Sequence, residues 1–115
     1  MAGSATCVAL WCYSQCNQTC QMYRNPKLLR LARLSDCKEC GADDGTIVAA
    51  HSNQGRDGKG MGMKSSDAAI AFICHRCHTE IDQGKEPAPI RLARWEAAHR
   101  ATMRWLIEEG HLKVA

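Results

Sequence analysis

Leucines and basic residues alternate along the segment NPKLLRLAR, at 25–33, with the period of an amphipathic helix. Asn25 suits the N-cap position, and Pro26 suits the first helical position. The pattern therefore predicts a helix that begins here. We expect its buried side to be formed by Leu28, Leu31 and Leu34, with Leu29 beside them.

Two short apolar runs predict the strands of a hairpin. GTIVAAH predicts a strand across about 46–51, and AAIAFIC predicts a return strand at 68–74. The segment between them, GRDGKGMGMKSSD, is rich in glycine and in basic residues, which indicates a flexible loop.

The C-terminal third of the chain has the pattern of two helices. HTEID predicts a short helix that Gly84 ends, and EPAP at 86–89 predicts a linker. From Ile90 to Glu109 the apolar positions predict a long helix closed by Gly110. The buried face of this helix is expected to comprise Leu92, Trp95, Ala98, His99, Met103 and Leu106. HLKVA follows as a tail or a terminal strand. The elements together predict an α+β fold.

The paired motifs CKEC, at 37–40, and CHRCH, at 74–78, carry the strongest chemical signal. Two Cys-x-x-Cys pairs are typical of one tetrahedral zinc ion held by four thiolates, here those of Cys37, Cys40, Cys74 and Cys77. The residue after a ligand on a helix is rotated by about 100°, so His78 is expected to face a different space. The alternative is that Cys74 and His78 bind the ion and leave Cys77 idle.

His51 ends the first predicted strand, beside the glycine-rich loop. Its imidazole could take a proton from water while His78 held a divalent cation on a phosphate, although a purely structural histidine is the alternative. The loop lacks the P-loop pattern. Its cations Arg56, Lys59 and Lys64 are candidate phosphate contacts.

Composition and charge limit the cellular compartments and the classes of binding partner that fit this sequence. The chain has 15 Lys and Arg against 12 Asp and Glu, so its net charge of +3 permits a nucleic-acid partner without requiring one. Eight cysteines could form disulfides in a secreted protein, but the start lacks a signal-peptide pattern. No stretch approaches the ~18 apolar residues of a membrane span. We expect a cytoplasmic protein, with no membrane partner and with a basic stripe at Arg24, Lys27, Arg30, Arg33 and Lys38.

Residues 1–23 differ from the rest in composition, with little charge and four cysteines. We expect a Cys-rich, poorly ordered leader there, followed by one domain at 24–115. A second metal site is the alternative, because three of its cysteines would share one helical stripe. The leader cysteines are Cys7, Cys12, Cys16 and Cys20.

The order Cys-x-x-Cys, a strand ending in His, and Cys-x-x-Cys-His resembles that of zinc-containing HNH (ββα-metal) endonucleases. NPKLLRLAR, AHSNQGRDGKGMGMKSSD and CHRCHTEID look like the small HNH-like nucleases of phages and prophages. The resemblance covers about residues 25–114 and is most specific from His51 to Asp82. It implies a ββα-metal hairpin-helix core, with the N-terminal and the long C-terminal helix beside it, acting in the cytoplasm of a bacterial host.

The same resemblance implies a function. His51 would be the general base, His78 would bind a catalytic Mg²⁺ or Mn²⁺, and the four cysteines would hold a structural Zn²⁺. DNA would be cut to leave a 5′-phosphate and a 3′-hydroxyl. Many HNH proteins carry Asp or His where this chain has Ala50, so Asn53 and Asp67 are candidate accessory ligands. The alternative is a non-catalytic zinc-stabilised module that binds DNA or protein, and homodimer formation is left open.

Overall fold

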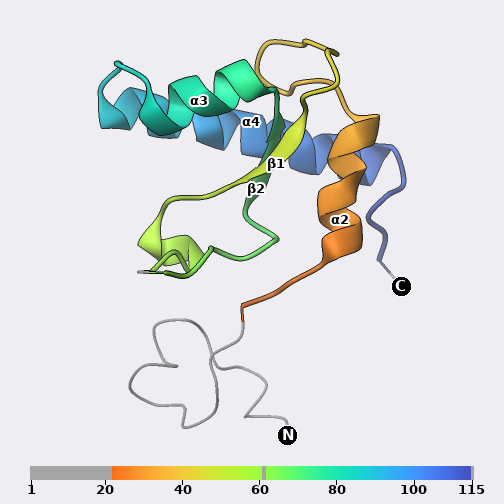
Figure 1. Cartoon of the computed structure of the whole chain (residues 1–115). Coiled ribbons are helices and arrows are strands. Elements are labelled where there is room, and N and C mark those ends of the chain that lie inside the picture. The colour runs from red at the N-terminus through yellow and green to blue at the C-terminus, as the bar shows by residue number, and fades with distance from the viewer. Residues whose placement is uncertain (1–21, 61, 115) are drawn as a thin grey trace, which may run out of the picture.

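The computed structural model describes residues 22–60 and 62–114, so the predicted leader lies almost wholly outside the described residues. The described chain forms a two-stranded sheet with helices around it (Figure 1). This confirms a small α+β fold. The elements are α2 (Pro26–Arg30), η2 (Leu31–Leu34), β1 (Val48–His51), η3 (Gly55–Asp57), β2 (Ile70–Ile73), α3 (His75–Gln83) and α4 (Ala88–Glu108).

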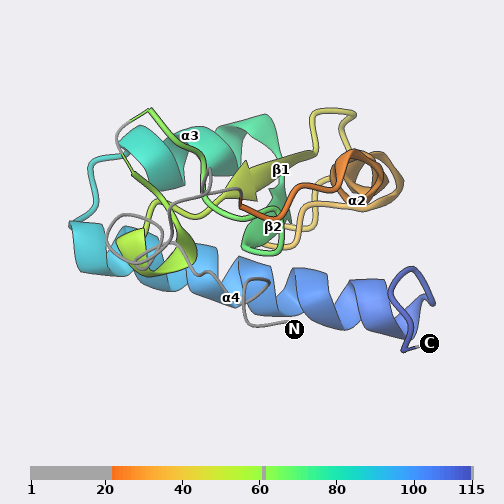
Figure 2. The same cartoon turned by 90° about the horizontal axis from the view of Figure 1, so that it is seen from below.

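The two strands pair antiparallel, as the hairpin pattern predicts, with Val48 opposite Ile73 and His51 opposite Ile70. Each strand is four residues long, shorter than the apolar run that contains it. Every residue of β2 is buried, because α4 packs along this strand and β1 pairs with it. Figure 2 shows α4 running along one side of the sheet, with α2 and α3 on the other side.

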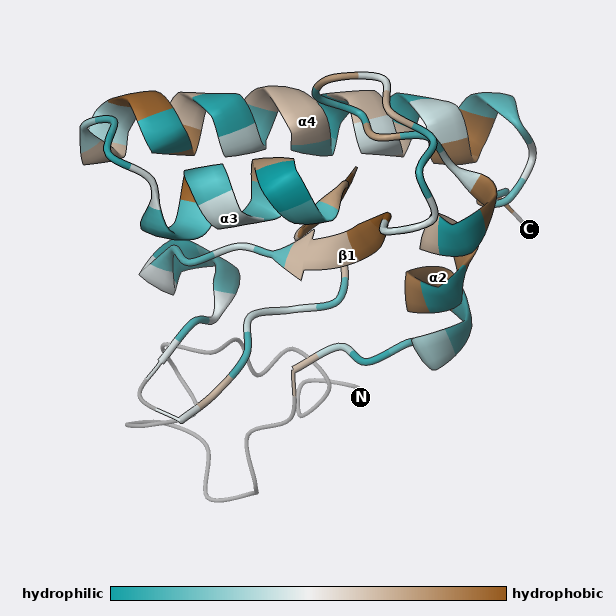
Figure 3. Ribbon diagram, turned by 45° about the horizontal axis from the view of Figure 1, so that its top comes forward, coloured by the Kyte–Doolittle hydropathy of each residue, from teal (hydrophilic) through white to brown (hydrophobic). Residues whose placement is uncertain are grey.

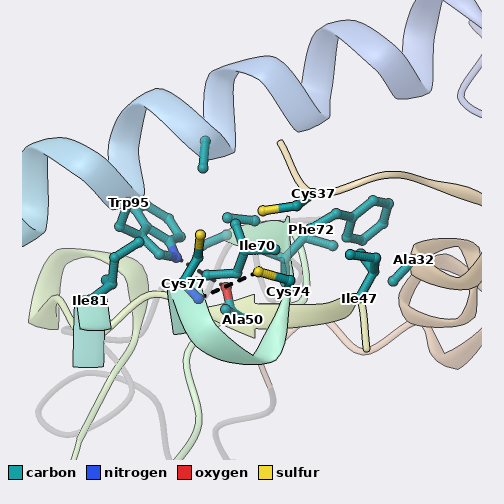
Figure 4. Packing of buried hydrophobic residues seen from close by; sticks show 14 of the residues in the cluster. Ala32, Cys37, Ile47, Ala50, Ile70, Phe72, Cys74, Cys77, Ile81 and Trp95 are labelled. Atoms are coloured by element: carbon teal, nitrogen blue, oxygen red, sulfur yellow. Dashed lines mark hydrogen bonds between the residues drawn. The ribbon is translucent and has the colours of Figure 1, made fainter. Parts of the chain in front are cut away.

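Three side chains of α4 bind the backbone of the sheet. Trp95 Nε1 donates to Ala50 O at 3.0 Å, and His99 Nδ1 lies 2.6 Å from Ile70 O. Thr102 Oγ1 accepts from Phe72 N at 2.9 Å and donates to Ala98 O at 2.8 Å. His99 and Thr102 thereby bind groups at the edge of β2 that a third strand would otherwise bind. The apolar side chains around this contact, among them Ile70, Phe72 and Trp95, form the core in Figure 4.

The predicted N-terminal helix exists, but its buried side differs from the prediction. Asn25 Oδ1 accepts from Leu28 N at 3.1 Å, which confirms the N-cap. After Arg30 the helix tightens into the 3₁₀ form, whose three residues per turn rotate the later side chains relative to an α-helix. Ala32 is therefore buried, whereas Leu34 is 68% exposed, and the prediction that Leu34 is buried was wrong.

The C-terminal helices follow their predicted positions closely. α3 ends at Gln83, before Gly84, where a Cβ atom would lie 2.0 Å from Glu80 O. α4 begins at Ala88, within the predicted linker, because Pro89 is tolerated in a first turn. Gly110 has φ +79°, which suits the residue that closes a helix. The tail at 111–114 forms no strand, and none of the described helices is long and apolar enough to span a bilayer.

Candidate functional site

The two Cys-x-x-Cys motifs meet in one place. The sulfur atoms of Cys37, Cys40, Cys74 and Cys77 all lie within 4.8 Å of one another, and none of these cysteines is in a disulfide. Cys40 Sγ and Cys74 Sγ are 3.7 Å apart. A tetrahedral zinc ion with Zn–S bonds of about 2.3 Å requires sulfur atoms about 3.8 Å apart. The quartet therefore has the donors and the spacing of a structural zinc site.

Local backbone turns aim amide groups at the sulfur atoms. The amides of Glu39 and Cys40 each lie 3.4 Å from Cys37 Sγ, and that of Cys77 lies 3.5 Å from Cys74 Sγ. Such donors stabilise a thiolate. Gly41, with φ +82°, allows the first turn to close.

The four thiols differ in exposure. Cys40 is exposed, and a backbone hydrogen bond at Ala42 lowers its pKa to about 7. Burial raises the pKa of Cys74 and of Cys77. Metal binding must therefore displace protons from these two buried thiols.

His78 is not part of this cluster. Among residues 22–60 and 62–114, the cysteine quartet is the only group of three or more Cys, His, Asp or Glu residues whose ligand atoms lie together. The backbone amide of His78 donates to Cys74 O at 2.9 Å, within the first turn of α3. The cluster thus contains Cys77, and the alternative that leaves Cys77 idle does not fit this geometry. The catalytic role of His78 stays a prediction.

A network of ion pairs that the sequence patterns did not reveal joins α4 to the turn of the first cysteine pair and to α3, the helix that carries Cys77. Arg94 Nε and Nη2 donate to the carboxylate of Glu39 at 2.7 and 2.5 Å, and Glu39 lies between Cys37 and Cys40. Arg94 also donates to Glu80 of α3 at 2.9 Å and to Glu86 at 2.7 Å. The hydrogen bonds from Arg94 hold the pKa of Glu39 below its ordinary value.

His51 and Asp67 form the second feature of the site. His51 Nε2 lies 2.8 Å from Asp67 Oδ1, while Asp67 Oδ2 accepts from Asn25 N at 2.7 Å and Arg24 Nη1 lies 3.2 Å from Oδ1. Burial favours the neutral acid, but the hydrogen bonds from His51 and Asn25 lower the pKa of Asp67 overall. The ionised carboxylate fixes the imidazole ring and directs its other nitrogen, Nδ1, away from Asp67.

The loop after β1 also contacts α3. Asn53 Nδ2 donates to Asp82 Oδ1 at 2.9 Å. Asp82 lies four residues after His78, so the two residues share one face of α3. The structure therefore places Asn53, a predicted accessory residue, beside the helix that carries His78, and it adds Asp82 as a candidate that the spacing did not single out.

The three predicted phosphate contacts have different surroundings. The guanidinium of Arg56 contacts the carboxylate of Glu96 on α4, so part of its charge is neutralised. Lys59 and Lys64 are exposed and form no ion pair within the part of the chain that the structure describes. Phosphate binding by these residues stays a prediction.

The hairpin thus carries a cluster of four cysteines at one end and, at the other end, a histidine bound to a buried carboxylate, with polar groups on one face of α3. The resemblance to HNH endonucleases has no support from other proteins and stays a prediction. Comparison of the chain with protein-family models, with curated proteins and with solved structures finds no match.

Proposed function

We propose that this chain is a metal-dependent DNA endonuclease, in which the cysteine quartet holds a structural zinc ion. The observation that carries the proposal is the His51–Asp67 pair at the end of β1. A histidine oriented by an ionised, buried carboxylate is a common general-base arrangement. Its position in a hairpin that leads directly into α3 agrees with the order of parts in the HNH pattern.

The chemistry of the pair follows from its geometry. Asp67 holds His51 Nε2, which leaves Nδ1 to take a proton from a water molecule. The resulting hydroxide forms a bond to phosphorus as the bond from phosphorus to the 3′-oxygen breaks, and that oxygen is protonated from solvent. Asp67 stabilises the imidazolium during this step. The products are a 5′-phosphate and a 3′-hydroxyl.

A divalent cation is part of the proposal. His78, Asp82 and Asn53 are the nitrogen and oxygen donors that could hold Mg²⁺ or Mn²⁺. Mg²⁺ commonly takes only one or two protein ligands and completes its coordination with water and substrate phosphate. When bound, such an ion would neutralise charge on the phosphate.

One observation favours a second candidate, a zinc-stabilised module that binds DNA or protein without cutting it. Within the described residues, the cysteines are the only set of three or more Cys, His, Asp or Glu ligand atoms that lie together. Neither His51 nor His78 belongs to that set. A second ion would therefore bind weakly without a substrate.

A plasmid-nicking assay separates the two candidates. We expect the zinc-loaded chain to nick supercoiled DNA only with Mg²⁺ or Mn²⁺, and His51→Ala to lower the rate by about 10²- to 10⁴-fold. His75→Ala is the matched control, because the His75 side chain is exposed at the start of α3. Absence of nicking by folded, zinc-loaded wild type at every cation concentration would favour the binding module. Equal rates for wild type and His51→Ala would remove His51 as the base.

A further inference from the structure

One side of α2 and η2 carries three exposed cations in a row. Lys27, Arg30 and Arg33 are exposed, and none of them forms an ion pair within the described residues. The opposite side of the same segment is buried through Leu28 and Ala32 and packs toward β1. Figure 3 shows the resulting alternation of hydrophilic and hydrophobic residues along α2.

The structure separates these three cations from the other members of the basic stripe. Arg24 is 43% exposed, but its guanidinium is engaged, because it contacts Asp67 and donates to Lys64 O at 2.9 Å. Lys38 pairs with Asp36 at 2.7 Å and lies over the ring of Trp105. The free positive charge of the stripe is therefore concentrated on α2 and η2, and the sequence from 22 to 35 contains no acidic residue to offset it.

The spacing of the row suits a nucleic-acid backbone. Residues three apart rise by about 4.5 Å in an α-helix and by about 6 Å in a 3₁₀ helix, where they also eclipse one another. The row from Lys27 through Arg30 to Arg33 thus extends over about 10 Å. The phosphates of one DNA strand repeat every ~3.4 Å along the duplex axis and lie farther apart along the winding strand, so charges spread over this length can face more than one phosphate.

Hydrogen bonds also connect the start of this row to Asp67, the residue that binds His51. The amide of Asp67 donates to Tyr23 O at 3.0 Å, and the amide of Asn25 donates to Asp67 Oδ2 at 2.7 Å. The start of α2 is thereby fixed to the His51–Asp67 pair. A strand bound along the row would therefore run toward that pair.

We propose that the exposed side of α2 and η2 binds the phosphate backbone of DNA and guides one strand toward His51. The choice of DNA as the ligand rests on the proposed function. The contacts are to phosphate alone, so this surface contributes affinity that does not depend on base sequence.

The test is a fluorescence-polarisation titration of a short labelled duplex with the full chain, without Mg²⁺ and over a range of salt concentrations. Lys27→Gln combined with Arg33→Gln removes the two ends of the row. We expect affinity to fall by about tenfold at low salt and the slope of log K against log salt to fall by about 2. The matched control is Lys85→Gln with Arg100→Gln, which removes the same charge from exposed positions elsewhere and should change affinity by less than about twofold.

Each other outcome overturns the proposal. Equal weakening by the two double variants would mean that only net charge matters, and unchanged DNA binding by the α2 variant would mean that the row does not touch DNA. Loss of binding to anionic phosphatidylserine vesicles, with DNA binding intact, would assign the row to a membrane surface. Melting temperature and zinc content should match wild type, because these side chains are exposed. The binding assay does not depend on cleavage, so it would still test DNA binding by this row if the chain proved not to be a nuclease.

Discussion

Arg94 offers the sharpest test of how the proposed zinc site is built, because this one side chain binds Glu39, between the first two cysteines, and Glu80, on the helix that carries Cys77. Arg94→Gln removes two hydrogen bonds to Glu39, together with those to Glu80 and Glu86. The Arg94 and Glu39 side chains are only 23% and 19% exposed, so the bidentate pair should contribute about 1.5–3 kcal/mol. The other two carboxylates are nearly half exposed and add about 0–1 kcal/mol each.

The expected loss in free energy of unfolding is therefore about 1.5–5 kcal/mol, which corresponds to a fall in melting temperature of roughly 6–20 °C for a domain of this size. Calorimetry of the zinc-loaded protein measures this loss. Release of zinc to a chromophoric chelator should also be faster, because Glu39 lies between Cys37 and Cys40, two of the proposed ligands. Arg94→Lys should fall between wild type and Arg94→Gln, since lysine keeps the charge but lacks the planar fork.

Arg100→Gln is the matched control for this experiment. It removes an exposed arginine from the same helix and should leave both measurements unchanged. If Arg94→Gln and Arg100→Gln gave the same melting temperature and the same rate of zinc release, the network would be a solvated surface feature. The reasoning from partial burial would then be refuted.

Three further outcomes are expected. Cys77→Ser should lose zinc and cooperative melting, whereas His78→Ala should keep both, as elemental analysis and calorimetry can check; zinc loss in His78→Ala would contradict the assignment. Thr102→Val should cost about 1–3 kcal/mol, because it leaves the buried amide of Phe72 without an acceptor, and an unchanged melt would disprove that. Asp67 has a lowered pKa in the fold, so its stabilisation is present above the ordinary Asp pKa of about 3.9 and is lost as pH falls through the folded pKa. The difference in free energy of unfolding between wild type and Asp67→Asn should therefore disappear only at acidic pH. A difference that did not change with pH would contradict a stabilising role for the ionised carboxylate.

The elements that local patterns specify could be predicted from the sequence. The Asn25 cap, the two strands and the long helix through Trp95 each depend on a pattern of residues close together in the sequence. Leu34 could not be placed correctly, because the change to 3₁₀ geometry after Arg30 moves the buried side of the helix to Ala32. Nothing in the leucine spacing marks that change.

The cysteine quartet was also accessible to sequence reasoning, because each pair closes within its own turn. The paired spacing predicts the ligands, and the structure brings all four sulfur atoms together. The predicted base, His51, likewise lies at the end of its strand. The residues that orient His51 and bind Glu39 could not be predicted from the sequence. Asp67 is 16 positions from His51, and Arg94 is 55 positions from Glu39, so only the folded chain joins them.

These long-range pairs also change how the net charge should be understood. Asp67, Glu39 and Glu96 are acidic residues that bind an imidazole or an arginine of the same chain. The positive charges of those partners are offset in place, so a formal charge of +3 says little about any one surface. The cations on α2 and η2 have no such partners within the described residues, and an acid-free stretch of chain surrounds them. These cations are therefore the part of the basic stripe that keeps its charge free, and under the proposal above DNA binding along the row should weaken as salt rises.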